Sequence, residues 1–359
     1  MKRVLFFLFI SILVGCNQDE KDCPLEPFSI PLKGERLIGL DLLDVTERGT
    51  FDDNLATARD LGINYLALHL SWSSIETSPE SYTDPGDALF LLNQVSVANN
   101  FQFSLTISPI DLTGKTVPSD LNNTRFNDTL MINRFKRLLD FVFTKMPTTT
   151  LLNLQIGNEI DGYDTNNEPA SFWSDYGVFL QEMTAYVHSI NPNVRVGFTG
   201  TLYGMSVHAN VFRTLQNNVD ILGVTYYPIE SNFDVKAPSV VDTEITTFLT
   251  NVAAKPVYFQ EIGYQTSATN NSSTAQQAAF FSNFFATWDQ HMDQIKTANI
   301  VRLNDISLTT AQDLASPFGI ADNTFVEYLR TLGLRTNEGS GNDKEALGRI
   351  RQLLIERGW

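Results

Sequence analysis

Two glutamates in this chain directly follow short, mostly apolar runs, and this placement points to paired acid–base chemistry. Glu159 follows the run LQIGN, and Glu261 follows the run VYFQ. A carboxylate that ends a buried run is costly unless it is paired, protonated or functional. Glycoside hydrolysis needs two such groups, one to protonate the leaving oxygen and one to attack the anomeric carbon or to activate water.

The two carboxyl groups need different protonation states for that reaction. The acid needs a raised pKa, whereas the nucleophile must stay ionised. Retaining enzymes separate the two groups by about 5 to 5.5 Å and inverting enzymes by about 6.5 to 9.5 Å. We predict a glycosidase that uses Glu159 and Glu261 as this pair. The alternative is that both glutamates are rim residues held in salt bridges.

The elements that position these residues are short apolar runs alternating with helical segments from residue 33 onward. Eight strand–helix units without a glycine-rich phosphate loop predict a single (β/α)8 TIM barrel of class α/β over residues 33–359, rather than an open doubly wound sheet. The runs are mostly β-branched or aromatic, as expected of strands buried on both faces. The predicted strands are 37–42, 65–70, 102–107, 152–156, 194–198, 221–225, 256–259 and 300–303. The predicted helices are 51–61, 87–99, 133–145, 172–190, 208–217, 242–252, 274–291 and 343–357.

Barrel chemistry collects at the C-terminal ends of the strands, so Glu159 and Glu261 should face one another at the ends of the fourth and seventh strands. Asn158-Glu159 and Glu261 at these places resemble the signature of glycoside hydrolase clan A, over about residues 34 to 359. Within the clan, the segments IGNEI and EIGY are most similar to the endo-β-1,4-galactanase family, as are IGLD and GINYL near the start. The resemblance implies a retaining enzyme in which Glu159 is the acid/base, Glu261 is the nucleophile and Asn158 binds the sugar 2-hydroxyl.

The same resemblance implies a tyrosine after the sixth strand that hydrogen-bonds the nucleophile. Tyr227 is our choice and Tyr226 the alternative, because strand alternation points only one of them inward. Trp72 follows the second strand and could stack on a pyranose ring. The other substrate-binding candidates at the expected mouth are Asp41, His69 and Asn304.

The sequence departs from the clan at two strands. The second strand reads YLALH and lacks the usual arginine, so either His69 replaces that donor or function is lost. The eighth strand ends in RLND instead of the usual tryptophan, which makes the floor of the site more polar. These departures keep a second function class open, a lipid-anchored glycan-binding protein on an inactive barrel. A side chain of Arg302 or Lys255 capping one glutamate would favour that alternative.

The N-terminus resembles a bacterial lipoprotein leader. A basic start and an apolar run end in LVGC, which predicts a signal peptide over residues 1–15. The lipobox-like end implies lipidation of Cys16 and an anchor in the outer membrane of the cell envelope. Residues 16–32 read as an acidic, proline-containing tether. Its acidic cluster is similar to tethers that route lipoproteins to the cell surface.

The amino-acid composition argues against some classes of partner and cofactor. The formal net charge is −16, which argues against nucleic acid. The four histidines have no metal-ligand spacing and both cysteines lie in residues 16–32, outside the predicted barrel, so we expect no metal and no cofactor. A barrel lyase or isomerase would need a metal or phosphate site that the pattern lacks. We expect a monomer that acts on a polysaccharide or oligosaccharide.

Overall fold

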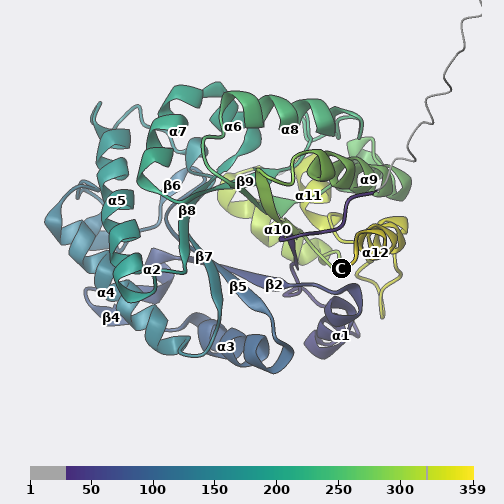
Figure 1. The fold of residues 1–359 in the computed structure, drawn as a ribbon, viewed down its shortest axis with the longest axis horizontal. Helices are drawn as coiled ribbons and strands as arrows, with labels where there is room; N and C mark the ends of the chain where they lie inside the picture. Colours follow the sequence, from purple (N-terminus) through teal and green to yellow (C-terminus); the bar gives the residue numbers. More distant parts are fainter. Residues whose placement is uncertain (1–29, 321) are drawn as a thin grey trace, which may run out of the picture.

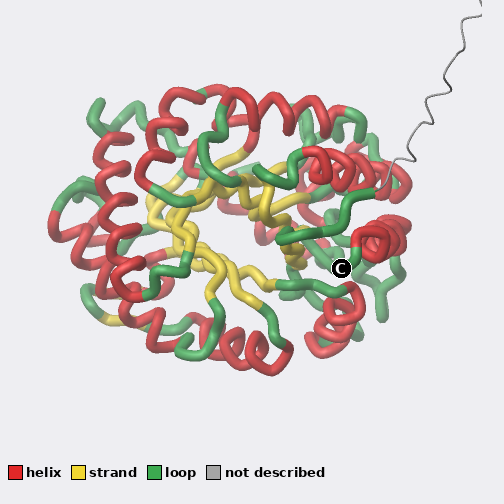
Figure 2. Tube along the Cα trace, viewed as in Figure 1, coloured by secondary structure: helices red, strands yellow, loops and turns green. Residues whose placement is uncertain are grey.

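The protein folds as a closed barrel of parallel strands surrounded by helices (Figures 1 and 2). This computed structural model describes residues 30–320 and 322–359, so the predicted signal peptide, Cys16 and most of the tether lie outside the described residues. The first strand pairs with both the second and the last, and the second pairs with the third strand of the barrel, so the sheet closes on itself. The predicted (β/α)8 fold is confirmed. The barrel strands, in order, are β1 (Leu37–Leu40), β2 (Tyr65–Ser71), β5 (Gln102–Asp111), β7 (Leu151–Asn158), β8 (Arg195–Thr201), β9 (Ile221–Tyr226), β10 (Val257–Ile262) and β11 (Ile295–Ile300).

Helices form the outer layer of the barrel (Figure 2). The first of them shows why the chain starts and stops helices where it does: Thr50 and Asp53 form a capping box, and Gly62 ends the helix in the left-handed region. The main helices are α1 (Phe51–Leu61), α3 (Ala88–Asn99), α4 (Thr129–Lys145), α5 (Phe172–Ile190), α7 (Ala209–Leu215), α8 (Val240–Asn251), α9 (Thr274–Gln290) and α12 (Glu345–Arg357). Shorter elements that we did not predict lie in the connections: α2 (Trp72–Ile75), β3 (Glu76–Ser78), β4 (Ser81–Tyr82), β6 (Gly114–Lys115), α6 (Leu202–Val207), α10 (Leu308–Ala315) and α11 (Asn323–Arg330).

The prediction of the eighth strand at residues 300–303 was wrong. The strand is β11, Ile295–Ile300, and the segment RLND lies in the loop after it. The strand reads IKTANI, and Thr297 and Asn299 are buried on its inner face while Ala298 and Ile300 are buried on the outer one. The strand does not form an apolar run in the sequence, because two of its five buried positions are polar.

The barrel strands are buried on both faces, as expected, but polar residues occupy many of their inward positions. Ser104 of β5 lies 3.0 Å from the amide oxygen of Asn153 and 3.1 Å from that of Gln260, across the barrel interior. The outward positions of β7, Leu154 and Ile156, are fully buried under the helices. The strands therefore alternate between polar residues inside and apolar residues outside.

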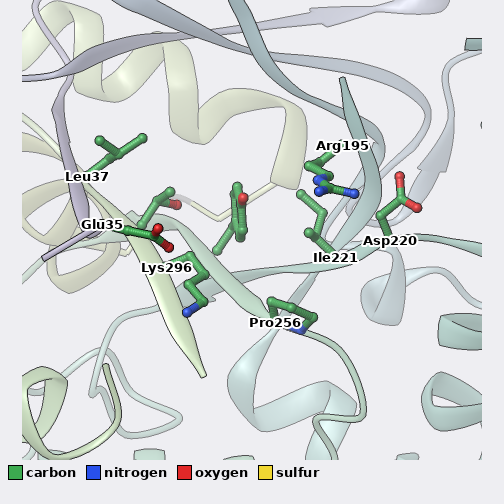
Figure 3. A pocket seen from close by; sticks show the side chains of 9 residues that line it. Glu35, Leu37, Arg195, Asp220, Ile221, Pro256 and Lys296 are labelled. Carbon is green, nitrogen blue, oxygen red and sulfur yellow. The ribbon is translucent and has the colours of Figure 1, made fainter. Parts of the chain in front are cut away.

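The N-terminal end of the barrel, opposite the ends that carry Glu159 and Glu261, holds a cavity of about 370 Å³ (Figure 3). Its lining includes two acidic side chains, Glu35 and Asp220, and two basic ones, Arg195 and Lys296. Arg195 is the first residue of its strand, so this cavity is separate from the predicted site. Within residues 30–320 and 322–359, we find no helix that combines the length and the apolar character needed to cross a bilayer.

Candidate active site

A sharp turn at the end of β7 aims Glu159 into the barrel mouth. Gly157 has a φ of 95°, and Glu159 itself lies in the left-handed region with a φ of 43°. A Cβ atom at position 157 would come within 2.5 Å of the Ile160 side chain and 2.6 Å of the Tyr176 hydroxyl, so only glycine fits. The turn brings Oε1 of Glu159 to the next strand but one, where the Thr225 hydroxyl donates to it at 2.7 Å.

A bulge in β10 positions Glu261. The register of β10 against β9 shifts between Phe259 and Glu261. Gln260 already points into the barrel, where its amide donates to Asn153 at 3.2 Å. Regular alternation would therefore turn Glu261 outward toward the helices, but the bulge lets both consecutive side chains face the interior. The hydroxyl of Tyr227, the residue after β9, donates to Oε2 of Glu261 at 2.6 Å.

The two carboxyl groups lie in one mouth and influence each other. Burial raises the pKa of Glu159, and the negative charge of Glu261 raises it further, to about 8. Burial also raises the pKa of Glu261, but the Tyr227 hydrogen bond and the charges of His69 and Arg302 act in the opposite direction. When the pair carries a single proton, that proton therefore resides on Glu159 more readily than on Glu261.

Positive charge near Glu261 comes from Arg302, in the loop after β11. Its guanidinium forms a salt bridge with Asp44 at 2.6 Å and does not cap either glutamate. Among the described residues, no lysine, arginine or histidine forms a salt bridge with Glu159 or Glu261. Lys255 is half-buried and lies before the start of β10, at the opposite end of that strand. The structure thus contradicts the alternative of salt-bridged rim residues.

A polar chain links two predicted residues on the other side of the mouth. The Asn158 side chain donates to Asp111 at 3.1 Å, and His69 lies 3.6 Å from the other oxygen of Asp111. His69 also lies 2.8 Å from the Ser108 hydroxyl. Asp41 directly follows β1, and its negative charge acts on Glu261, which places it in the same mouth. Asn158, His69 and Asp41 therefore lie in the same mouth as the glutamates, while their roles in binding stay predictions.

Three predicted site residues lie elsewhere, and these predictions were wrong. Trp72 is fully buried against Phe135, with its indole N–H bonded to Glu76, so its faces cannot receive a sugar. Tyr226 points outward, because its hydroxyl bonds Glu244 of α8. Asn304 is fully buried and holds the loop after β1 through the Asp44 carbonyl and the Asn54 side chain.

Sequence reasoning missed three residues of the mouth. Thr225 has a recognisable signal, since it stands two positions after the inward Gly223 in β9 and therefore shares its face. Asp111 ends β5, the place where barrels collect functional residues. Tyr328 comes from α11 in the loop after β11, where no strand pattern directs attention to it. Among the described residues, no three His, Cys, Asp or Glu side chains are grouped as metal ligands.

No protein-family model and no curated protein matches this sequence. Solved structures do share its fold. A GH5_18 protein from Bifidobacterium longum subsp. infantis is 13% identical over 89% of this chain and 79% of its own, with a TM-score of 0.63. A GH53 catalytic domain from Ignisphaera aggregans is 14% identical over 90% of this chain and 98% of its own, with a TM-score of 0.63. A psychrophilic family 10 endo-β-1,4-xylanase is 12% identical over 89% and 99%, with a TM-score of 0.60. At these identities the likeness establishes a shared barrel fold.

Proposed function

We propose that this protein is a retaining glycoside hydrolase that cleaves β-linked polysaccharides or oligosaccharides with two glutamates. The observation that carries the proposal is the unequal tendency of the two glutamates at the mouth of the barrel to hold a proton. Glu159 has a pKa of about 8 and can hold a proton at neutral pH, whereas Glu261 accepts a hydrogen bond from Tyr227 that favours its ionised form.

The first chemical step breaks the glycosidic bond. The Glu261 carboxylate attacks the anomeric carbon while Glu159 gives its proton to the departing oxygen, and a covalent glycosyl-enzyme ester forms. In the second step Glu159, now ionised, takes a proton from water. The resulting oxygen attacks the anomeric carbon and releases Glu261, so the anomeric configuration is retained and both glutamates return to their starting states.

The choice of β-linked substrates rests on resemblance. The segments around Glu159 and Glu261 are similar to those of endo-β-1,4-galactanases, and one solved structure with this fold is an endo-β-1,4-xylanase. The lipobox-like segment around Cys16 supports an anchored enzyme at the outer membrane. Incorporation of a labelled fatty acid into the wild-type chain, and its loss in Cys16→Ser, would test that anchor.

A screen of aryl β-glycosides and plant or algal polysaccharides tests the proposed function. We expect Glu261→Ala to abolish hydrolysis of every substrate that the wild type cleaves. Glu159→Ala should spare aryl substrates with good leaving groups, because these need little protonation, and should lose the natural glycans. Equal losses on both kinds of substrate would count against Glu159 as the acid.

Azide provides a second, stereochemical readout. With Glu159→Ala, azide should attack the glycosyl-enzyme and yield the β-glycosyl azide. With Glu261→Ala, azide should enter the vacated nucleophile position and yield the α-glycosyl azide. NMR of the wild-type reaction should show the β-anomer as first product, and an initial α-anomer would overturn retention. A wild type that binds glycans without cleaving any would favour the inactive-barrel alternative.

A further inference from the structure

A helical hairpin after β11 forms one wall of the region beside the glutamates. Its helices, α10 and α11, share an apolar cluster that is separate from the main core. Phe233, from the loop after β9, packs into this cluster with its ring centroid 4.7 Å from that of Phe325. The cluster consists of Ile306, Ala311, Ala315, Phe325 and Val326.

The loop after β10 also holds α11 in place. The Ser267 hydroxyl donates to Glu327 of α11 at 2.9 Å, and the Asn270 side chain donates to the Thr324 carbonyl at 2.9 Å. Asn270 donates to the Phe233 carbonyl as well, at 2.8 Å. The loops that contact the hairpin thus follow β9 and β10, the same two strands that position Tyr227 and Glu261. This places α11 in a defined position relative to the predicted nucleophile.

Tyr328 is the residue of α11 that points toward the glutamates. Its ring meets the Tyr227 ring edge to face, with centroids 5.7 Å apart and an interplanar angle of 87°. Tyr227 in turn reaches Glu261 at 2.6 Å. Burial and the negative charges of both Glu159 and Glu261 hold the pKa of Tyr328 well above its usual range. The hydroxyl therefore stays protonated and can donate a hydrogen bond at any working pH.

The Tyr328 hydroxyl differs from those of the neighbouring tyrosines in making no hydrogen bond to the part of the chain that the structure describes. Tyr226 donates to Glu244, Tyr227 to Glu261 and Tyr264 to the Lys236 carbonyl. No hydrogen bond among the described side chains uses the Tyr328 hydroxyl, and the ring alone suffices for its packing. A free donor beside two carboxylates is suited to a sugar, whose hydroxyls both donate and accept.

We propose that Tyr328 is a substrate-binding residue, whose hydroxyl donates a hydrogen bond to a sugar hydroxyl at the cleavage position. This inference rests on the proposed glycosidase function and names a specificity contact of the same site. The donor comes from a loop helix and not from a strand end, so the length and packing of the hairpin would set which sugars are accepted.

The test compares Tyr328→Phe, which keeps the ring, with Tyr186→Phe as a matched control. Tyr186 lies in α5 and its hydroxyl bonds Asp140 on the outer helices, away from the mouth. We expect Tyr328→Phe to lower kcat/KM about 3- to 30-fold. The thermal midpoint and both limbs of the pH–rate profile should stay unchanged, and the control should match the wild type.

Aryl glycosides that each lack one ring hydroxyl identify the partner of Tyr328. For one of them the penalty of Tyr328→Phe should shrink below about twofold, because the hydrogen bond is already absent. A penalty equal on all of these substrates, or no penalty on any, would overturn the proposal. If the wild type binds glycans without cleaving them, the proposed function fails, and the same variants compared by calorimetric affinity still decide the role of Tyr328. A wild type that neither binds nor cleaves overturns both.

Discussion

The hydroxyl of Tyr227 lies 2.6 Å from Oε2 of Glu261 and donates its proton to that oxygen. Gly263 makes this contact possible, because a Cβ atom there would come within 2.6 Å of the Tyr227 ring. A hydrogen bond to a carboxylate favours its charged form and lowers its pKa. The pair therefore holds the predicted nucleophile ready to attack, in a setting where burial alone would favour its protonation.

Tyr227→Phe should shift the pH dependence of catalysis. Loss of the donor raises the pKa of Glu261, so the acidic limb of kcat/KM moves to higher pH, and kcat/KM at its optimum falls about 10- to 100-fold. Steady-state kinetics over the pH range would measure both effects. Tyr226→Phe is the matched control, because the Tyr226 hydroxyl bonds Glu244 outside the mouth. The acidic and basic limbs of its kcat/KM profile should therefore stay where they are in the wild type. An unmoved acidic limb in Tyr227→Phe would refute the role of this contact.

The wild-type activity should be lost in base as Glu159 ionises. Since the pKa of Glu159 is raised to about 8, Glu159 stays protonated in the free enzyme up to about that pH. We therefore expect kcat/KM to decline above it. In Glu159→Gln, residual cleavage of a good aryl leaving group should not show this basic limb. A basic limb that persists unchanged in the variant would mean that another group titrates there.

Glu159→Gln should also stabilise the fold, increasingly so as pH rises. The folded-state pKa of about 8 lies above the ordinary value of 4.5, so between these values the folded protein binds more protons than the unfolded chain. Wild-type stability therefore falls with rising pH in this window, by at most about 1.4 kcal/mol per pH unit from this group. Glutamine cannot ionise and can still accept from Thr225.

Chemical unfolding of both proteins at pH 5 and pH 8 would measure that difference. The gap in unfolding free energy should be wider at pH 8 than at pH 5. Glu182→Gln on α5 serves as the control, because Glu182 is half exposed and its salt bridge within the described residues is with Lys136. A gap that stays constant with pH would show that Glu159 does not carry the raised pKa in the folded protein.

Trp72→Phe separates packing from substrate binding at the second strand. Trp72 is fully buried, and its indole N–H donates to Glu76 at 2.7 Å, within a network that includes Arg134. We expect the unfolding free energy to fall by about 1 to 3 kcal/mol, because a buried hydrogen bond and part of the ring volume are lost. Urea unfolding and KM measured together check this. A raised KM at unchanged stability would restore Trp72 as a sugar platform.

The sequence supports some site residues better than others, and the difference has a physical basis. Glu159 and Glu261 could be found because a charged residue at the end of an apolar run is costly, which makes it conspicuous. Trp72 was misplaced because an aromatic residue near a strand end packs in a core as readily as it lines a mouth. Asn304 was misplaced because the eighth strand ends earlier than its apolar pattern indicates, which puts this residue in a buried loop contact.

The sequence by itself determined the barrel fold and placed the two glutamates at the C-terminal ends of its fourth and seventh strands. Strand and helix periodicity are local properties, and eight repeats of them leave few ways to bury the apolar faces. Only the tertiary structure decided that Glu261 turns inward beside Gln260, because the bulge in β10 depends on its register against β9. It also decided that Tyr328 from α11 stands beside both carboxylates. That placement depends on contacts between loops far apart in the chain, which no local pattern encodes.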